Sequence, residues 1–237
     1  MSTEKYKTSG ETRSKKAKNQ RKKFRRKSRS LSVGVKAAVF IGVAVIALGA
    51  IFFLNNGNSS MASIGKAGNY PYQVAQPGRG EQAPPIRLSS TDGSTFDLAS
   101  QRGKTVLLFF QEGLACQPCW DQIKDMESNM KQFQALGIDR VVSITTDPLD
   151  ALKQKVADEG ITTPVLSDAS FSVSQVYHAN QYGMMDGSRD GHTFIVVGPD
   201  GRIRWRADYG GAPNYTMYVP VPSLIADMKE GLNGKSS

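Results

Sequence analysis

The only two cysteines of the chain, Cys116 and Cys119, have two residues between them and lie where an apolar run is followed by a helical pattern. The run Val106–Phe110 predicts a buried strand, and apolar residues from Trp120 to Phe133 recur at intervals of three and four, which predicts a helix. Cys116 is therefore expected at the start of this helix, where free N–H groups and the positive end of the helix dipole favour its thiolate. Pro118 is expected in the first turn, where its missing N–H does no harm.

This placement predicts redox chemistry at Cys116 and Cys119. The thiolate is the reactive form of cysteine, so Cys116 is the predicted nucleophile, and Cys119, one turn further on, can attack the mixed disulfide and release the partner. A structural zinc site needs about four ligands, whereas this chain offers two cysteines and two widely spaced histidines, His178 and His192. Zinc is disfavoured, no metal or other cofactor is predicted, and a purely structural disulfide stays as an alternative.

The positive charge of the chain is concentrated at its N-terminus. The formal net charge is +9, yet residues 1–30 hold 13 Lys or Arg and two acidic residues, and the remainder holds 17 basic and 19 acidic residues. Residues 1–30 are predicted to be a disordered cytoplasmic tail that contacts anionic lipid headgroups or only sets membrane topology. The near-neutral body gives no reason to expect a nucleic-acid partner.

Residues 37–54 form an unbroken run of 18 apolar or glycine residues, long enough at about 1.5 Å per residue to cross a bilayer. We expect a single transmembrane helix over residues 31–54 that acts as an uncleaved signal anchor. A cleaved signal peptide is the alternative, although its apolar region is usually shorter. Because the basic tail precedes the span, the positive-inside rule predicts a cytoplasmic N-terminus and a catalytic domain outside the cytoplasm, where disulfides persist.

The rest of the chain divides into a linker and one folded domain. Residues 55–79 are rich in Asn, Gly, Ser and Pro and predict a flexible linker, with Tyr70, Tyr72 and Val74 docking on the body. Residues 80–232 predict strands that alternate with helices, hence parallel β-α-β units, and a late hairpin that adds an antiparallel edge. The predicted strands or extended segments cover 83–88, 95–98, 106–110, 141–144, 163–166, 193–197 and 203–206, and the predicted helices cover 116–136, a segment from 147, 171–177 and 224–232.

These motifs, taken in order, resemble a known group of proteins. The matching stretches are Gly80–Pro84, Asp92-Gly93, Gly103-Lys104, Cys116-Gln117-Pro118-Cys119 and Thr193-Phe194 to Asp200-Gly201. They are similar to thioredoxin-fold redoxins of the alkyl hydroperoxide reductase/thiol-specific antioxidant superfamily, especially its membrane-tethered thiol–disulfide oxidoreductases. The resemblance implies an α/β, thioredoxin-like three-layer fold with a central mixed β-sheet. It further implies an oxidoreductase in which Cys116 attacks and Cys119 resolves, with protein thiol or disulfide clients and an electron donor as partners.

One departure from that family concerns the residue before the late strand. The family usually has a cis-proline there, facing the cysteines, and this chain has Gly191-His192-Thr193, so the resemblance places His192 close to the disulfide. Three interpretations stay open: an imidazolium that lowers the pKa of Cys116, a structural histidine, or a ligand in a copper-binding or copper-delivery module of Cys116, Cys119 and His192. Related copper chaperones have three residues between their cysteines, which counts against copper.

Three further interpretations rest on single residues. Peroxiredoxins that resemble this chain carry a Thr three residues before the peroxidatic cysteine, where this chain has Gly113, so a thiol peroxidase is the second expectation after thiol–disulfide exchange. Glu112 is interpreted as a proton acceptor for Cys119 or as an exposed turn carboxylate. Trp120 is expected to pack on the body rather than to form a substrate platform.

Overall fold

The computed structural model describes residues 67–234. The predicted basic tail (1–30), the predicted membrane span (31–54) and the first part of the predicted linker therefore lie outside the described residues. Within the described part, no helix is both long and apolar enough to cross a bilayer.

The described residues form alternating strands and helices. The strands are β1 (Arg87–Ser90), β2 (Thr95–Asp97), β3 (Val106–Phe110), β4 (Arg140–Thr145), β5 (Val165–Ser167), β6 (Thr193–Val197) and β7 (Ile203–Asp208). The helices are α3 (Gln117–Ser128), α4 (Met130–Ala135), α5 (Leu149–Glu159), α6 (Ser172–Val176) and α7 (Val221–Asn233), with short 3-10 segments η1 (Leu98–Gln101), η2 (Gly113–Ala115) and η3 (Ala179–Gln181). Each predicted strand overlaps an observed one.

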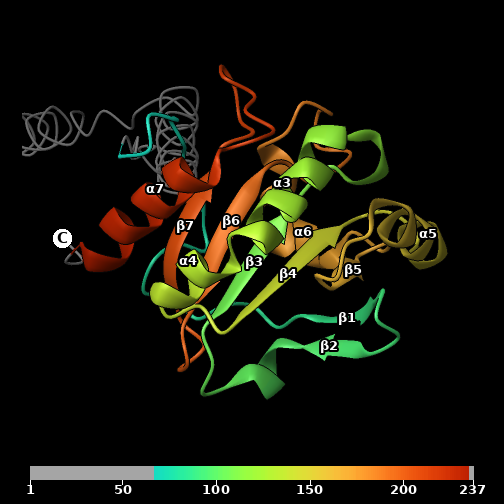
Figure 1. The fold of residues 1–237 in the computed structure, drawn as a ribbon, viewed down its shortest axis with the longest axis horizontal. Helices are drawn as coiled ribbons and strands as arrows, with labels where there is room; N and C mark the ends of the chain where they lie inside the picture. The colour runs from blue at the N-terminus through green and yellow to red at the C-terminus, as the bar shows by residue number, and fades with distance from the viewer. Residues whose placement is uncertain (1–66, 235–237) are drawn as a thin grey trace, which may run out of the picture. The chain divides into compact units, whose positions relative to one another are not determined.

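The strands form one mixed sheet in the order β2-β1-β5-β4-β3-β6-β7 (Figure 1). Strand β3 runs parallel to β4 and β4 parallel to β5, which confirms the predicted β-α-β units around α3 and α5. The predicted hairpin of β6 and β7 is antiparallel, and β6 also pairs antiparallel with β3. Strand β1 pairs antiparallel with both β2 and β5, so the other edge is antiparallel as well.

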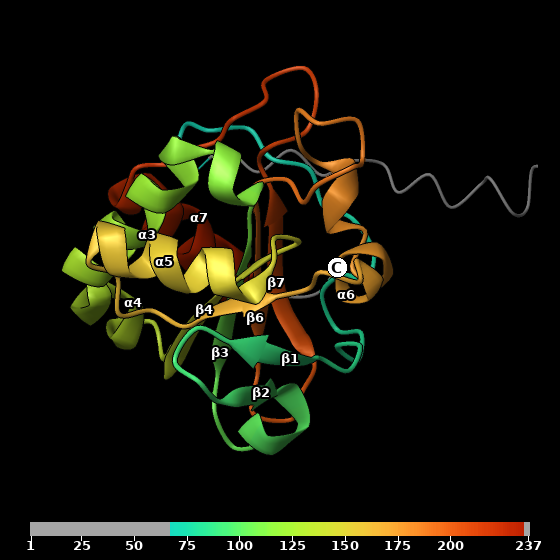
Figure 2. The same cartoon turned by 90° about the vertical axis from the view of Figure 1, so that its right-hand side faces the viewer.

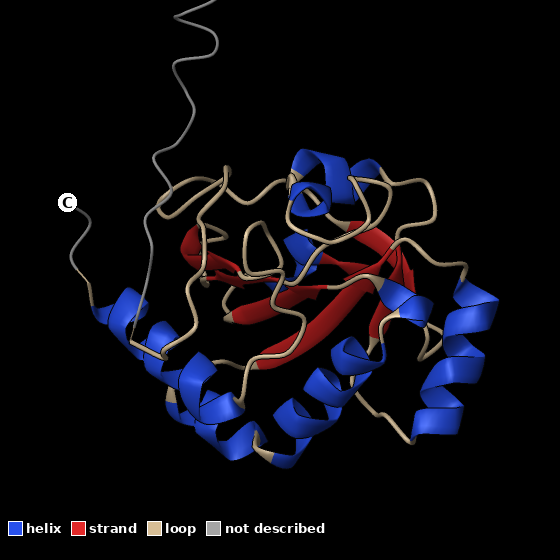
Figure 3. Ribbon diagram, turned by 90° about the horizontal axis from the view of Figure 1, so that it is seen from above, coloured by secondary structure: helices blue, strands red, loops and turns tan. Residues whose placement is uncertain are grey.

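Helices cover both faces of the sheet, so the domain has three layers. Side chains alternate along a strand, and on β3 Leu107 and Phe109 belong to a core with α3, α5 and α7, whereas Leu108 and Phe110 belong to a second core with α6. Figure 2 shows α3, α4, α5 and α7 on one side of the sheet and α6 on the other, and Figure 3 shows the strands enclosed between them. The central strand β3 is buried throughout and ends directly before the cysteines.

The predicted helix 116–136 is interrupted, which corrects the sequence interpretation. Helix α3 ends at Ser128 and α4 begins at Met130, because Asn129 leaves helical geometry with φ −112° and ψ 16°. Its side-chain amide donates a hydrogen bond to the Asp125 carbonyl at 2.9 Å, and such local bonds let Asn compete with the helix. The second helix ends before Gly137, which adopts a positive φ of 83° as a helix terminator.

Part of the predicted linker packs on the domain. Tyr72 is buried in the core, and the Ala75 N–H donates to the Asp208 carboxylate at 2.8 Å. The same carboxylate accepts hydrogen bonds from Thr193 Oγ1 at 2.7 Å and from Arg206, whose side chain is fully buried with it. This buried ion pair therefore fixes the incoming chain to β6 and β7.

Candidate active site

Cys116 and Cys119 form a disulfide at the N-terminus of α3. Cys116 caps this helix, and its Sγ accepts a hydrogen bond from the Cys119 N–H at 3.3 Å. Pro118 lies in the first turn, where no intrahelical donor is needed. Cys116 is 5% exposed and Cys119 is fully buried, while Ala115, Gln117 and Pro118 around Cys116 are exposed. Of the two residues, Cys116 is therefore the one closer to solvent.

A tight turn at Gly113 joins β3 to the cysteines. Its φ is +85°, and a Cβ at this position would lie 1.7 Å from Asp147 Oδ2, so only glycine fits. That carboxylate accepts a hydrogen bond from the Leu114 N–H at 2.7 Å and pairs with Arg189 at 2.8 Å. The Gly113 carbonyl in turn accepts the Cys116 N–H at 3.0 Å. Sequence reasoning missed Asp147 and Arg189, which hold the turn that presents Cys116.

The side chains that flank the cysteine motif are structural. Trp120 is fully buried and its indole N–H donates to the Gly113 carbonyl at 3.0 Å, consistent with the packing interpretation. Glu112 is only 3% exposed, so its interpretation as an exposed turn carboxylate is wrong. Its Oε1 accepts a hydrogen bond from the Met184 N–H at 2.7 Å. Glu112 therefore ties the loop that follows η3 to the end of β3.

His192 lies directly against the sulfur of Cys119. Its Nδ1 is 4.0 Å from Cys119 Sγ, and its ring is fully buried between Phe109 and Phe194 at edge-on centroid distances of 4.8 and 5.2 Å. Burial lowers the pKa of His192 to about 3, so the imidazole is neutral at neutral pH. In this disulfide state the ring therefore carries no positive charge toward the cysteines, and the interpretation of an imidazolium beside a Cys116 thiolate concerns the reduced protein.

Gln122 is a further site residue that sequence reasoning missed. It is fully buried on α3, and its Oε1 accepts the Val219 N–H at 2.7 Å and lies 3.3 Å from His192 Nε2. The sequence did contain a signal, namely a polar residue among the positions that form the buried face of α3, which Gln122 shares with Cys119 and Ile123. A buried amide requires hydrogen-bond partners, and those partners lie 70 and 97 residues away in the chain.

Copper binding was an alternative interpretation of the cysteine pair. Among residues 67–234, no group of three or more His, Cys, Asp or Glu side chains is arranged to hold a metal ion. The two sulfurs are bonded to each other and so are not free as thiolate ligands. The copper interpretation of Cys116, Cys119 and His192 is therefore not carried further.

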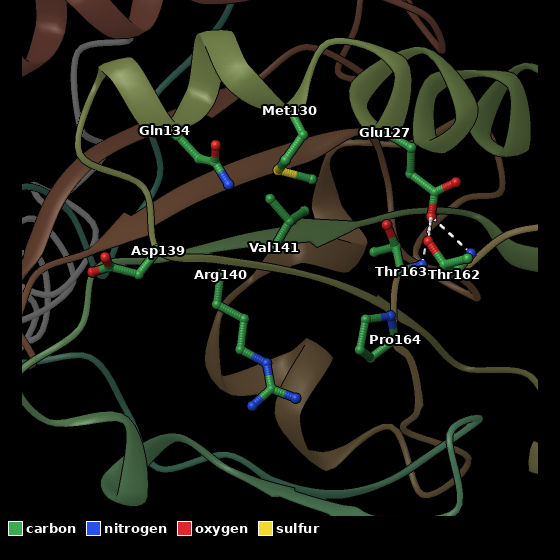
Figure 4. Close-up of a pocket in the computed structure, with 9 residues that line it drawn as sticks. All are labelled: Glu127, Met130, Gln134, Asp139, Arg140, Val141, Thr162, Thr163 and Pro164. Carbon is green, nitrogen blue, oxygen red and sulfur yellow. Dashed lines mark hydrogen bonds between the residues drawn. The ribbon is translucent and has the colours of Figure 1, made fainter.

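A cavity of about 330 Å³ opens at the other end of α3. Figure 4 shows its lining, which is Glu127, Met130, Gln134, Asp139, Arg140, Val141, Thr162, Thr163 and Pro164. The Glu127 carboxylate accepts hydrogen bonds from the backbone N–H groups of Thr162 and Thr163 and is thereby occupied. Neither cysteine nor His192 lines this cavity, so it is separate from the candidate active site at the disulfide.

Comparison with known proteins decides the family. A sequence model of the AhpC/TSA family matches residues 79–206. The chain belongs to the AhpC/TSA family. Among AhpC/TSA relatives, "Putative peroxiredoxin Rv2521" of Mycobacterium tuberculosis is 31% identical over 128 residues, which is 52% of this chain and 80% of that protein. "Peroxiredoxin 2" of Thermoplasma acidophilum is 27% identical over 140 residues, 55% of this chain and 66% of that protein.

Solved structures support the same fold. The crystal structure of peroxidoxin BcpB from Mycobacterium tuberculosis superimposes with a TM-score of 0.53 at 19% identity, covering 64% of this chain and 96% of that one. Mycobacterium tuberculosis AhpC also gives 0.53 at 17% identity, covering 66% of this chain and 93% of that one. The resemblance to AhpC/TSA redoxins is confirmed, as is the thioredoxin-like fold with a mixed central sheet. The family also supports the general prediction that the protein is an oxidoreductase.

Proposed function

We propose that this AhpC/TSA protein is a thiol–disulfide oxidoreductase that exchanges disulfides with protein clients through Cys116 and Cys119. A client thiolate attacks Cys116 Sγ, the Cys116–Cys119 bond breaks, and Cys119 leaves with the electron pair. In the opposite direction, the Cys116 thiolate attacks a client disulfide, whose S–S bond breaks and releases one client thiolate. Cys119 then attacks Cys116 Sγ in the mixed disulfide, displaces the second client thiolate and closes the intramolecular disulfide. The client disulfide gains the two electrons that the cysteine pair loses.

The observation that carries this proposal is the asymmetry of the two sulfurs. Cys116 caps α3, where the helix dipole and the Cys119 N–H stabilise a negative charge on its sulfur. Cys119 is fully buried one turn further along, within bonding reach of Cys116 but shielded from a second partner. A nucleophile just below the surface, among exposed neighbours, with a fully buried resolving thiol behind it suits thiol–disulfide exchange.

Peroxide reduction is the second candidate, and the peroxiredoxin names of the relatives favour it. In that reaction the Cys116 thiolate would attack a peroxide oxygen, water or an alcohol would leave, and Cys119 would condense with the sulfenic acid to form the same disulfide. The site offers less support for it, because the position three residues before Cys116 is the buried turn of Gly113 and supplies no hydroxyl.

The deciding experiment compares the two substrates on one preparation. The full-length chain in mild detergent, recycled by a dithiol, is expected to reduce insulin disulfides with a higher kcat/KM than it reduces hydrogen peroxide. Cys116→Ser should abolish both activities, whereas Cys119→Ser should accumulate a mixed disulfide with the client. A preference for peroxide of tenfold or more would replace the proposal by the peroxidase candidate.

We also propose that the domain works outside the cytoplasm as a single-pass membrane protein. The support is the sequence: the apolar run 37–54 follows a tail with 13 basic residues. The clients and the electron donor would then be extracytoplasmic proteins. When the chain is expressed in bacteria, externally added protease should digest the domain in spheroplasts. Protection of the domain until the membrane is lysed would contradict this topology.

A further inference from the structure

The imidazole of His192 has one ring nitrogen on each of two different partners. Nε2 faces Gln122 Oε1 at 3.3 Å and Nδ1 faces Cys119 Sγ at 4.0 Å. A neutral imidazole carries one proton, so one of these nitrogens is a donor and the other an acceptor. The position of this proton decides whether Nδ1 can accept a proton from Cys119 or donate one to it.

Gln122 decides which nitrogen carries the proton. The Val219 N–H can only donate, and it donates to Gln122 Oε1 at 2.7 Å. If the amide were flipped, its NH₂ group would face that N–H and two donors would meet. Oε1 is therefore also the atom beside His192, and because it can only accept, Nε2 must carry the proton. The lone pair of Nδ1 is left pointing at Cys119.

The orientation of Gln122 leaves its amide nitrogen without a partner. Gln122 Nε2 is buried and has no hydrogen-bond partner in the described structure, an uncommon state for a native side chain. Both N–H donors of the amide are thus left unpaired while its oxygen serves both Val219 and His192. This arrangement is difficult to explain by packing alone, and it is what a residue that orients the imidazole requires.

The backbone of His192 is held as firmly as its ring. Its N–H donates to the Tyr182 carbonyl at 3.1 Å, and its carbonyl accepts the Tyr209 N–H at 2.8 Å. A Cβ on Gly210 would lie 2.7 Å from the backbone nitrogen of His192, so the two backbone segments are closely packed there. Nδ1 therefore has little freedom to leave the sulfur.

We infer that His192 is the proton acceptor for Cys119 in the resolving step, and that Gln122 is a positioning residue that fixes the required tautomer. This inference rests on the proposed thiol–disulfide exchange. In the mixed disulfide, the Cys119 thiol faces Nδ1. The S–H proton passes to Nδ1 as Cys119 Sγ attacks Cys116 Sγ, the Cys116–Cys119 bond forms, and the client sulfur leaves with its electron pair. The proton then passes from the imidazolium to the departing thiolate or to solvent.

A buried neutral imidazole suits this step because its basicity follows the charge on the sulfur. With no negative charge nearby, burial favours the neutral ring, which keeps the lone pair of Nδ1 free. As the thiolate develops at hydrogen-bonding distance, its charge favours the imidazolium. The nearest ring neighbours, Phe109 and Phe194, are uncharged and do not compete for that proton.

The kinetic test separates the two chemical steps with DTNB, a coloured aromatic disulfide. Attack by Cys116 on DTNB releases the first equivalent of coloured thiolate, and resolution by Cys119 releases the second. His192→Gln keeps a polar group near the Nε2 position and removes the one at Nδ1. The ratio of the second rate to the first is expected to fall about 100-fold, the lower end of the range for general bases. Gln122→Met should lower it about fivefold, the value of one neutral hydrogen bond.

Tyr218→Phe is the matched control for Gln122→Met. The Tyr218 hydroxyl donates to Asp125 at 2.8 Å, so this variant also loosens the segment around Val219 from α3, but without touching His192. The rate ratio should stay within twofold of wild type in this control. An equal loss in Tyr218→Phe and Gln122→Met would show that the amide acts only as a loop anchor and would overturn its positioning role.

A spectroscopic test needs no change at the site. The chain has two histidines, and His178→Asn removes the signals of the exposed one. In this background ¹⁵N NMR of the oxidised protein should show His192 protonated on Nε2, with a mixture of tautomers after Gln122→Met. Protonation on Nδ1 in the wild type would overturn the inference, as would an unchanged rate ratio in His192→Gln. A missing first phase with DTNB would instead contradict the proposed function, because it reports Cys116 alone.

Discussion

Substitution of Gly113 by alanine probes the turn that presents Cys116. The new Cβ would lie 1.7 Å from Asp147 Oδ2 and 2.4 Å from Thr145 Oγ1, so Asp147 must move. Its hydrogen bond from the Leu114 N–H and its pairing with Arg189 would then be lost. The backbone strain of a positive φ costs about 1 kcal/mol, and the loss of a partly buried hydrogen bond to a charged group costs about 2–3 kcal/mol more.

The sum, about 3–4 kcal/mol, corresponds to a decrease in Tm of roughly 9–12 °C for a domain of this size. Gly137→Ala is the matched control, because Gly137 has nearly the same φ, +83°, and a Cβ there meets nothing within 4 Å. This variant should lose only the strain, about 1 kcal/mol or roughly 3 °C. Thermal unfolding of the oxidised full-length chain in detergent, followed by circular dichroism, measures both. Equal decreases in the two variants would refute the close-contact reasoning.

Two further predictions concern buried charged groups. Arg206→Met leaves the fully buried Asp208 unpaired and should reduce the free energy of unfolding by about 3–5 kcal/mol in urea titrations, whereas a loss below about 1 kcal/mol would contradict a buried ion pair. Burial raises the pKa of the Asp190 carboxyl well above its usual range, so the native state holds a proton that the unfolded chain releases above about pH 4. The contribution of Asp190 to stability should therefore be complete below about pH 4 and decrease as the pH rises above it. Asp190→Asn should weaken this decrease, and an identical pH dependence in urea titrations would contradict the assignment.

Local pattern was sufficient for most of the fold. The apolar run Val106–Phe110 and the alternation of strands with helices predicted the central strand and the parallel units, because periodicity reports which face of an element is buried. The helix break at Asn129 was not predicted, because the apolar periodicity continues through this position. The hydrogen bond from the Asn129 side chain to the Asp125 carbonyl, which competes with the helix, leaves no trace in that periodicity.

The candidate site was predicted only as far as short-range spacing and family resemblance reach. The two cysteines lie three positions apart on a helix start, so spacing alone indicated their pairing. His192 came from the resemblance, but its neutral state follows from complete burial, which the sequence does not give. Gln122, Val219 and Asp147 act through contacts between residues 33 to 97 positions apart, and only the folded chain brings them together.

The position of Asp208 has a mechanical consequence. One carboxylate joins the Ala75 amide, near the start of the domain, to the Thr193 hydroxyl, whose residue directly follows His192. The segment that enters the domain therefore has a direct hydrogen-bonded connection to the strand that begins beside the imidazole.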